Sequence, residues 1–78
     1  MRHSERPQPA LGKAVRQLRD KRGITQETLA SKASLTVRSL SAIETGKGNP
    51  TWATVGDIAS ALGVSVAELA KAAEKFEA

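Results

Sequence analysis

The side chains best suited to chemistry in this chain lie between residues 36 and 42, where small, hydroxyl-bearing and cationic groups follow one another. Arg38 stands out, because a guanidinium can donate two parallel hydrogen bonds to O6 and N7 of guanine in the major groove of DNA. Val37 can pack on a thymine methyl group. Two simpler roles stay open, in which Arg38 holds only a phosphate and Val37 completes the core. The pattern favours contact with DNA base edges by Thr36, Val37, Arg38, Ser39, Ser41 and Ala42.

These side chains need a helix that turns them outward, and the surrounding segment supplies one. Residues 25–44 read TQETLASKASLTVRSLSAIE, which predicts two short helices joined by a tight turn at Ser34. Thr25 and Thr36 are good N-caps, because their hydroxyls can accept a hydrogen bond from an amide of the first helical turn. The second helix would enter the major groove, as in a helix-turn-helix. The expected buried residues are Leu29, Ala30, Ala33, Leu40 and Ile43.

Three further helices are expected around this pair. Leu11, Val15 and Leu18 have the spacing of one helical face, and Ser65 begins a capping-box pattern. No segment alternates as a strand would. We therefore predict an all-α fold, with a flexible basic arm at residues 1–9 and one helix-turn-helix domain at residues 10–76. The predicted helices cover residues 10–22, 25–33, 36–45 and 51–62, with a fifth starting at Ser65.

Composition excludes several classes of protein. The 78 residues include no cysteine and a single histidine, His3, which excludes a disulfide framework and argues against a zinc site. No apolar run approaches the roughly 18 residues that span a bilayer, and the start lacks the apolar stretch of a signal peptide. The expected location is the cytoplasm, in association with the nucleoid. Because no acid pair or glycine loop has a catalytic arrangement, we expect no enzyme, no catalytic residue, no metal and no cofactor.

Positive charge is concentrated in the first part of the chain. Residues 1–47 contain ten Lys and Arg against four Asp and Glu, whereas residues 48–78 contain two against four. A cationic surface on the segment that carries the two short helices is what a protein that meets phosphates requires. The alternative is a basic surface that only keeps the protein soluble.

Three segments together resemble a known family. They are LRDKRGITQETLASKA, TVRSLSAIETGKGNPT and IASALGVSVAEL, and their order and spacing resemble the phage-repressor and Cro-like helix-turn-helix family, also called the xenobiotic-response-element family of bacterial transcriptional regulators. The resemblance covers about residues 11–70. It implies a compact five-helix bundle of the lambda-repressor-like DNA-binding type.

The resemblance also implies roles for residues that position the reading helix. In such proteins the glutamine that opens the second helix binds a DNA phosphate and braces the start of the third helix, a role that falls on Gln26. The alternative for Gln26 is an ordinary first-turn residue. The family often pairs an arginine with the glutamate that ends the third helix, here Arg19 and Glu44. A partly buried pair would hold that helix at one angle and leave the remaining arginine donors for a phosphate.

The loop after the third helix often touches the sugar-phosphate strand in this family. The phosphate contacts expected there are Lys47, Asn49, Thr51 and the backbone amides of Gly46 and Gly48. Further candidates on the first helix are Lys13, Arg16 and Arg22. Arg2 and Arg6 on the arm are candidates for a neighbouring minor groove.

Two residues depart from the family pattern. Ser34 stands where the family usually has glycine, so a left-handed turn there would add about 1 kcal/mol of strain. Trp52, the only tryptophan, stands where a smaller residue is common. Three roles for it stay open, in this order: packing over the core, shielding a dimer contact, and lying against the DNA backbone. Some relatives read the centre of the operator with an arginine near Pro50, whereas Thr51 and Trp52 occupy that part of this chain.

The expected partner is double-stranded DNA. One reading head contacts only a few base pairs, so specificity generally requires two heads about 34–36 Å apart on an inverted repeat. We therefore expect a homodimer on a near-palindromic operator. The expected function is a sequence-specific transcriptional regulator, either a repressor or a small controller protein. The alternative is an antitoxin or another protein-binding module of the same fold, which would bind a toxin and its own operator. The expected dimer surface is the region of the fourth and fifth helices, where Gly63, Val64, Val66 and the tail to Phe76 supply apolar area, although Val64 and Leu69 fit the monomer core better.

Overall fold

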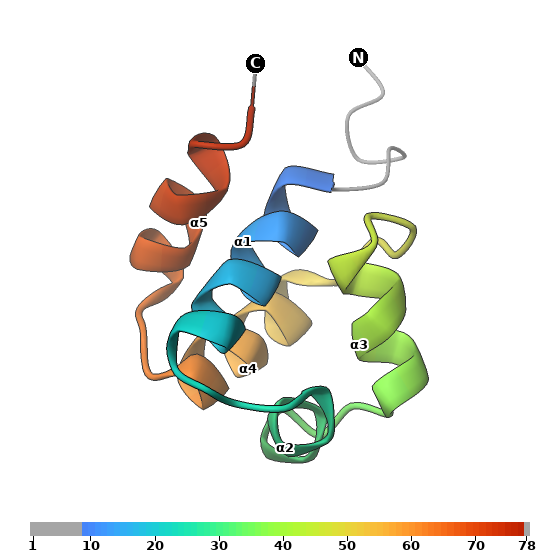
Figure 1. Cartoon of the computed structure of the whole chain (residues 1–78). Coiled ribbons are helices and arrows are strands. Elements are labelled where there is room, and N and C mark those ends of the chain that lie inside the picture. The colour runs from blue at the N-terminus through green and yellow to red at the C-terminus, as the bar shows by residue number, and fades with distance from the viewer. Residues whose placement is uncertain (1–8, 78) are drawn as a thin grey trace.

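Five α-helices follow one another in a computed structural model of the chain, which describes residues 9–77 (Figure 1). None of these residues lies in a strand, so the expected all-α fold is confirmed. Every predicted helix boundary lies within one residue of the observed one. The helices are α1 (Pro9–Lys21), α2 (Gln26–Lys32), α3 (Val37–Glu44), α4 (Trp52–Leu62) and α5 (Val66–Glu74).

The start of α1 differs slightly from the prediction. Pro9 was placed in the arm, but it is the first residue of α1. Proline suits this position because the first amide of a helix has no intrahelical partner and the ring favours helical φ. The rest of the predicted arm, with Arg2 and Arg6, lies outside the described residues.

The four later helices begin in the same way, and each beginning is encoded locally. A Ser or Thr in extended conformation precedes each helix, and its hydroxyl accepts a hydrogen bond from the amide three residues later. Such a cap contributes about 1 kcal/mol. Before α5 the capping box is complete, because Glu68 Oε1 also accepts from the Ser65 amide at 2.8 Å. The capping residues are Thr25, Thr36, Thr51 and Ser65.

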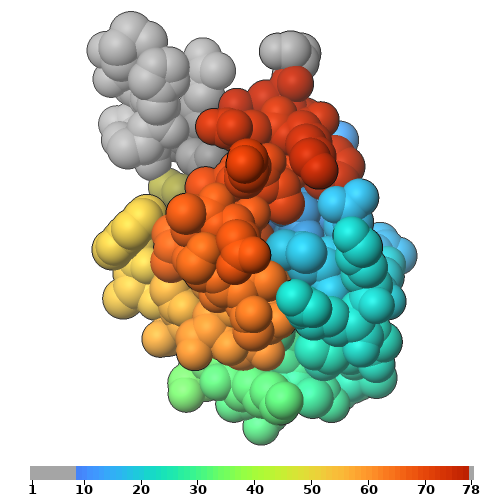
Figure 2. All heavy atoms as spheres, turned by 90° about the vertical axis from the view of Figure 1, so that its left-hand side faces the viewer, coloured from blue at the N-terminus to red at the C-terminus, as the bar shows by residue number. Residues whose placement is uncertain are grey.

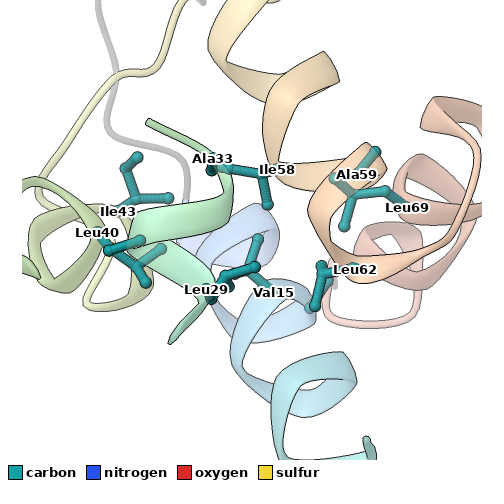
Figure 3. Close-up of a cluster of buried hydrophobic side chains, with 11 residues drawn as sticks. Val15, Leu29, Ala33, Leu40, Ile43, Ile58, Ala59, Leu62 and Leu69 are labelled. Atoms are coloured by element: carbon teal, nitrogen blue, oxygen red, sulfur yellow. The ribbon is translucent and has the colours of Figure 1, made fainter. Parts of the chain in front are cut away.

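The core is built around α1. This helix contacts α3, α4 and α5, while α2 packs against α3 and α4, and Figure 1 shows α3 and α5 on opposite sides of it. Side chains from all five helices meet in the centre (Figure 3). Within α5, Leu69 is buried and Ala70 is exposed, while Phe76 follows the helix and is 36% exposed. The largest fully buried side chains are Val15, Leu29, Leu40, Ile58, Leu62 and Leu69.

Gly12 allows α1 and α3 to cross at very short distance. A Cβ atom at this buried position would lie 2.1 Å from the carbonyl oxygen of Ile43 and 2.8 Å from that of Glu44. No side chain larger than hydrogen fits there without a shift of backbone. The position of α3 against the domain therefore depends on a glycine that nothing in the neighbouring sequence marks as special.

The turn between α2 and α3 is left-handed at a residue that is not glycine. Ser34 has a φ of 59°, so the turn keeps the conformation expected for the family. A Cβ in this region costs about 1–2 kcal/mol. The strained residue lies next to Leu35, whose amide donates to the Ala30 carbonyl at 2.8 Å and closes the turn.

Trp52 does not pack over the core, contrary to the first of its expected roles. It is the first residue of α4, and 76% of its surface is exposed. The other two expected roles, a dimer contact and a contact with DNA, both need this exposure.

No single helix among residues 9–77 is long and apolar enough to cross a membrane. Only α4 and α5 together have the required length and apolar composition, and the two helices meet at a bend of 96°.

Candidate nucleic-acid interface

The outward face of α3 carries the residues that were expected to read DNA. Leu40 and Ile43 point into the core, whereas Val37, Arg38 and Ser39 are exposed. Val37 is 39% exposed, so it does not complete the core and its alternative role is excluded. Ser41 and Ala42 are half-buried, which agrees with small residues that permit close approach.

Thr36 has a structural task at the start of this face. Its hydroxyl accepts from the Ser39 amide at 3.0 Å and donates to Ser39 Oγ at 3.0 Å. Both hydroxyls are thus held in the cap of α3, although both residues remain exposed. Arg38, between them, carries the long cationic side chain of the first turn.

The end of α3 is held by a buried carboxylate. Glu44, whose side chain is 3% exposed, accepts hydrogen bonds from Arg19 Nε at 2.8 Å and Arg19 Nη2 at 3.1 Å. Gln26 Nε2 donates to the same carboxylate at 3.0 Å. Three donors from α1 and α2 therefore converge on the last residue of α3. Two parallel bonds to a carboxylate give the guanidinium one orientation.

Two details of the expected roles need correction. Gln26 braces the end of α3 rather than its start, since its amide group donates to Glu44. Arg19 does not hold its remaining group free for a phosphate, because Nη1 donates to the Ile24 carbonyl at 3.0 Å and the side chain is only 12% exposed. Arg19 is a positioning residue, and its charge is balanced within the fold.

The electrostatics of this pair favour its ionised form. The hydrogen bond with Glu44 raises the pKa of Arg19 above its usual value, against the opposing effect of burial. Because one cation faces one carboxylate, the network brings no net positive charge to the surface. Cations that meet phosphates must therefore come from exposed side chains such as Arg16, Arg38 and Lys47.

The loop after α3 offers fewer phosphate contacts than expected. The amides of Gly46 and Gly48 donate to carbonyls of α3, at 3.1 Å to Ile43 and 3.0 Å to Ala42. They therefore cap the end of α3 and do not point at a ligand. The Thr51 hydroxyl is likewise used as the cap of α4. Lys47 and Asn49 have exposed side chains in this loop.

Arg16 of α1 and Arg22, which directly follows α1, lie on two different surfaces. Arg16 lines a cleft of about 470 Å³ with Gln26 and Ser41, beside the start of α2 and the end of α3. Its ion pair with Asp20 is long, at 3.9 Å, and both side chains are more than half exposed. Arg22, in contrast, donates to the Leu62 carbonyl at 2.6 Å and lies with α5 residues in a different groove. Arg22 therefore lies away from the candidate interface, whereas Arg16, which was also a candidate, lies beside it.

A metal site is not visible in the part of the chain between residues 9 and 77. No three His, Cys, Asp or Glu side chains gather there in a way that could hold an ion. The interface consists of hydroxyl, amide and cationic groups around an exposed helix.

Comparison with known proteins identifies the fold of this interface. A family model described as a helix-turn-helix domain matches residues 10–72. The chain belongs to the helix-turn-helix family. It is 39% identical over 59 residues to the HTH-type transcriptional regulator y4dJ of Sinorhizobium fredii, covering 76% of this chain and 77% of y4dJ. It is also 34% identical over 62 residues to the HTH-type transcriptional regulator DdrOP3 of Deinococcus deserti, of which it spans 48%.

Solved structures agree with this membership. The clp gene regulator ClgR of C. glutamicum superposes with a TM-score of 0.87 at 31% identity, over 91% of this chain and 92% of ClgR. The restriction-modification controller protein C.AhdI of Aeromonas hydrophila gives 0.76 at 31% identity, over 78% of this chain and 92% of C.AhdI. The repressor-like family suggested by the sequence is confirmed, and the protein is a DNA-binding transcriptional regulator.

Proposed function

We propose that this helix-turn-helix protein binds a near-palindromic operator as a homodimer and reads base edges in the major groove with the outward face of α3. The observation that carries the proposal is the contrast between the two ends of α3. Its C-terminal end is held by the hydrogen bonds to the buried Glu44, while its first turn presents the exposed side chains of Val37 and Arg38. A helix that is held at one end and exposed at the other can insert its first turn into a groove.

Individual roles follow from side-chain chemistry and placement. Arg38 is the base-reading residue, since its guanidinium can grip one guanine with two bonds. Val37 meets a thymine methyl, and Ser41 and Ala42 let the backbones approach. Lys47, Asn49 and Arg16 contact phosphates around the helix and set its register.

The proposed regulatory role is that of a repressor or a small controller protein. The likeness to C.AhdI, a restriction-modification controller protein, supports it. Two copies are needed because one domain of this size covers only a few base pairs.

The test is selection of bound sequences from a random DNA pool by the wild-type protein. The expected result is an inverted repeat with half-sites about one helical turn apart. Arg38→Ala should then lose preference at one position of each half-site, by about 1–3 kcal/mol. Lys47→Ala should weaken binding to all sequences alike and lower the salt slope by about one.

Lys71→Ala is the matched control, because Lys71 is exposed but lies on α5, opposite α3. It should change neither specificity nor the salt slope. If Arg38→Ala lost equal affinity for selected and random DNA, the base-reading role would be refuted. If the wild type selected no sequence at all, the proposed operator binding would be refuted.

A further inference from the structure

A groove between the end of α1 and one side of α5 combines an apolar surface with a cluster of cations. It has a volume of about 270 Å³. Figure 2 shows the end of α1, in cyan, beside α5, in orange and red. The half-buried apolar surface of the groove consists of Leu18, Val64 and Ala72. The exposed charged side chains that line it are Arg22, Glu68, Lys71 and Lys75.

The three cations of this groove have no carboxylate partner within residues 9–77. None of the salt bridges in that part of the chain includes them. The one carboxylate of the groove, Glu68, is used in the capping box, where Oε1 accepts from the Ser65 amide at 2.8 Å. Arg22 uses only Nε to bind the Leu62 carbonyl, so its two terminal nitrogens remain available. The groove therefore has an excess of positive charge.

Helix α5 separates its charges between two sides. Lys71 and Lys75 are four residues apart, so they lie on the same side of the helix, toward the end of α1. Glu74 and Glu77 lie on the other side, which faces the start of α1 and the first turns of α4. Like charges at this spacing destabilise a helix slightly. The arrangement is unfavourable for the domain alone, and a partner with negative charge would relieve it.

That negative charge does not come from the DNA at α3, because α3 and α5 lie on opposite sides of α1 (Figure 1). A whole small ligand is also a poor match, since the pockets that enclose such molecules have volumes of about 300–1,000 Å³. The groove is smaller and has an apolar strip beside its cations. This combination matches an amphipathic helix that carries an apolar stripe with acidic residues at its edges.

We propose that the groove between α1 and α5 binds an acidic amphipathic helix of another protein. The apolar side chains of that helix pack on Leu18 and Ala72, and its carboxylates bind the three cations. Lys71 and Lys75 are about 6 Å apart along α5, and acids four residues apart on the incoming helix have the same spacing. Because the groove faces away from α3, the regulator can hold DNA and this partner at the same time. The proposal goes beyond operator binding and does not depend on it.

The probe for this site is a fluorescein-labelled peptide of about 15 residues, a length at which isolated helices begin to form. It has leucines at positions i, i+3, i+4 and i+7, with glutamates on both sides of this stripe. Fluorescence anisotropy with the full chain should show saturable binding that weakens as salt is added, because exposed ion pairs are screened. A peptide with glutamine in place of every glutamate should bind about tenfold more weakly or worse. A peptide with serine in place of every leucine should also lose affinity.

Charge-matched variants separate this groove from the general positive charge of the chain. Lys71→Gln combined with Lys75→Gln should weaken peptide binding by about fivefold to tenfold, which is the loss of two exposed ion pairs. Lys13→Gln combined with Lys32→Gln removes the same charge at exposed positions outside the groove. This control should bind the peptide within about twofold of the wild type. The groove variant should select the same DNA sequences as the wild type, because α5 lies opposite α3.

Three results would overturn the proposal: a wild type that shows no saturable binding, equal weakening in the two double variants, or equal binding of the glutamate and glutamine peptides. Two other occupants of the groove would be recognised in the same experiments. If the groove binds DNA, the groove variant loses DNA affinity, and if it binds a second copy of the chain, the variant self-associates more weakly in sedimentation velocity. Either result without peptide binding refutes the acidic helix. Operator selection by the wild type can succeed or fail independently of each outcome.

Discussion

Replacing Gly12 by alanine should destabilise the protein, although alanine is the better helix former. Inside a helix alanine gains about 0.5–1 kcal/mol over glycine. At Gly12, however, the new Cβ would lie 2.1 Å from the Ile43 carbonyl oxygen, whereas carbon–oxygen contacts begin near about 3.3 Å. The two helices would have to separate locally by more than about 1 Å, and the backbone of Glu44 would move with them.

The magnitude follows from these opposing effects. Overpacking of this kind costs about 1–3 kcal/mol, and a contact this short lies at the upper end. After the gain in helix propensity, we expect a net loss of about 2 kcal/mol in the free energy of unfolding. In a domain of this size that corresponds to a melting temperature lower by about 8–16 °C.

Gly56→Ala provides the matched control. Gly56 also lies within a helix, α4, but a Cβ there would meet no atom within 4 Å. It should gain about 0.5–1 kcal/mol. Urea denaturation of both variants, followed by circular dichroism, measures the two changes under the same conditions. A Gly12→Ala protein as stable as the wild type, or two variants that shift in the same direction, would refute the inferred crossing of α1 and α3.

Three further substitutions test other parts of the fold. Glu44→Ala should lower the free energy of unfolding by about 3–5 kcal/mol in urea denaturation, because it leaves a buried guanidinium without its acceptor. Arg16→Ala, which removes an exposed ion pair, should lower it by less than about 1 kcal/mol. Equal losses in the two variants would contradict the buried network around Glu44. The pKa of Glu68 is lowered, mainly by the backbone hydrogen bond from Ser65, so its stabilising contribution is complete above its ordinary pKa of about 4.3 and is lost as the pH falls below that value. The urea midpoint of Glu68→Gln should therefore lie below that of the wild type at pH 7 and approach it at pH 3, and a difference that grows in acid would disprove the capping box. Ser34→Gly should raise the free energy of unfolding by about 1 kcal/mol by relieving the left-handed backbone, and a loss of stability on thermal denaturation would contradict this.

Features encoded by neighbouring residues could be predicted from the sequence. Each Ser or Thr cap lies within three residues of the amide that it binds, and so Thr25, Thr36 and Ser65 located the starts of three helices. Thr51, which was expected to contact a phosphate, caps α4 in the same way. The apolar spacing then indicated which face of each helix is buried. The pairing of Arg19 with Glu44, 25 residues apart, came only from the family resemblance.

Features that depend on how two helices cross could not be predicted. Nothing local distinguishes Gly12, which is crowded by α3, from Gly56, which is not. Gln26, the first residue of α2, finds its partner in Glu44 at the far end of α3. The amides of Gly46 and Gly48 bond to carbonyls of α3, which have no further partner within the helix. All of these features depend on distances between helices that are far apart in the sequence, and such distances are set only when the helices pack together.

The residues that hold α3 in place are different from those that it exposes to solvent, and this affects how the DNA specificity of such a protein can diverge in evolution. The residues that hold this helix are buried or lie at its end, whereas Val37, Arg38 and Ser39 project into solvent. Substitutions at exposed positions away from such features usually change stability by less than about 0.5 kcal/mol. If α3 reads DNA as proposed, duplicated copies of the gene can acquire new operators through a few changes in one helical turn, while the scaffold stays as it is. Cross-talk between sister regulators would be resolved by those few positions.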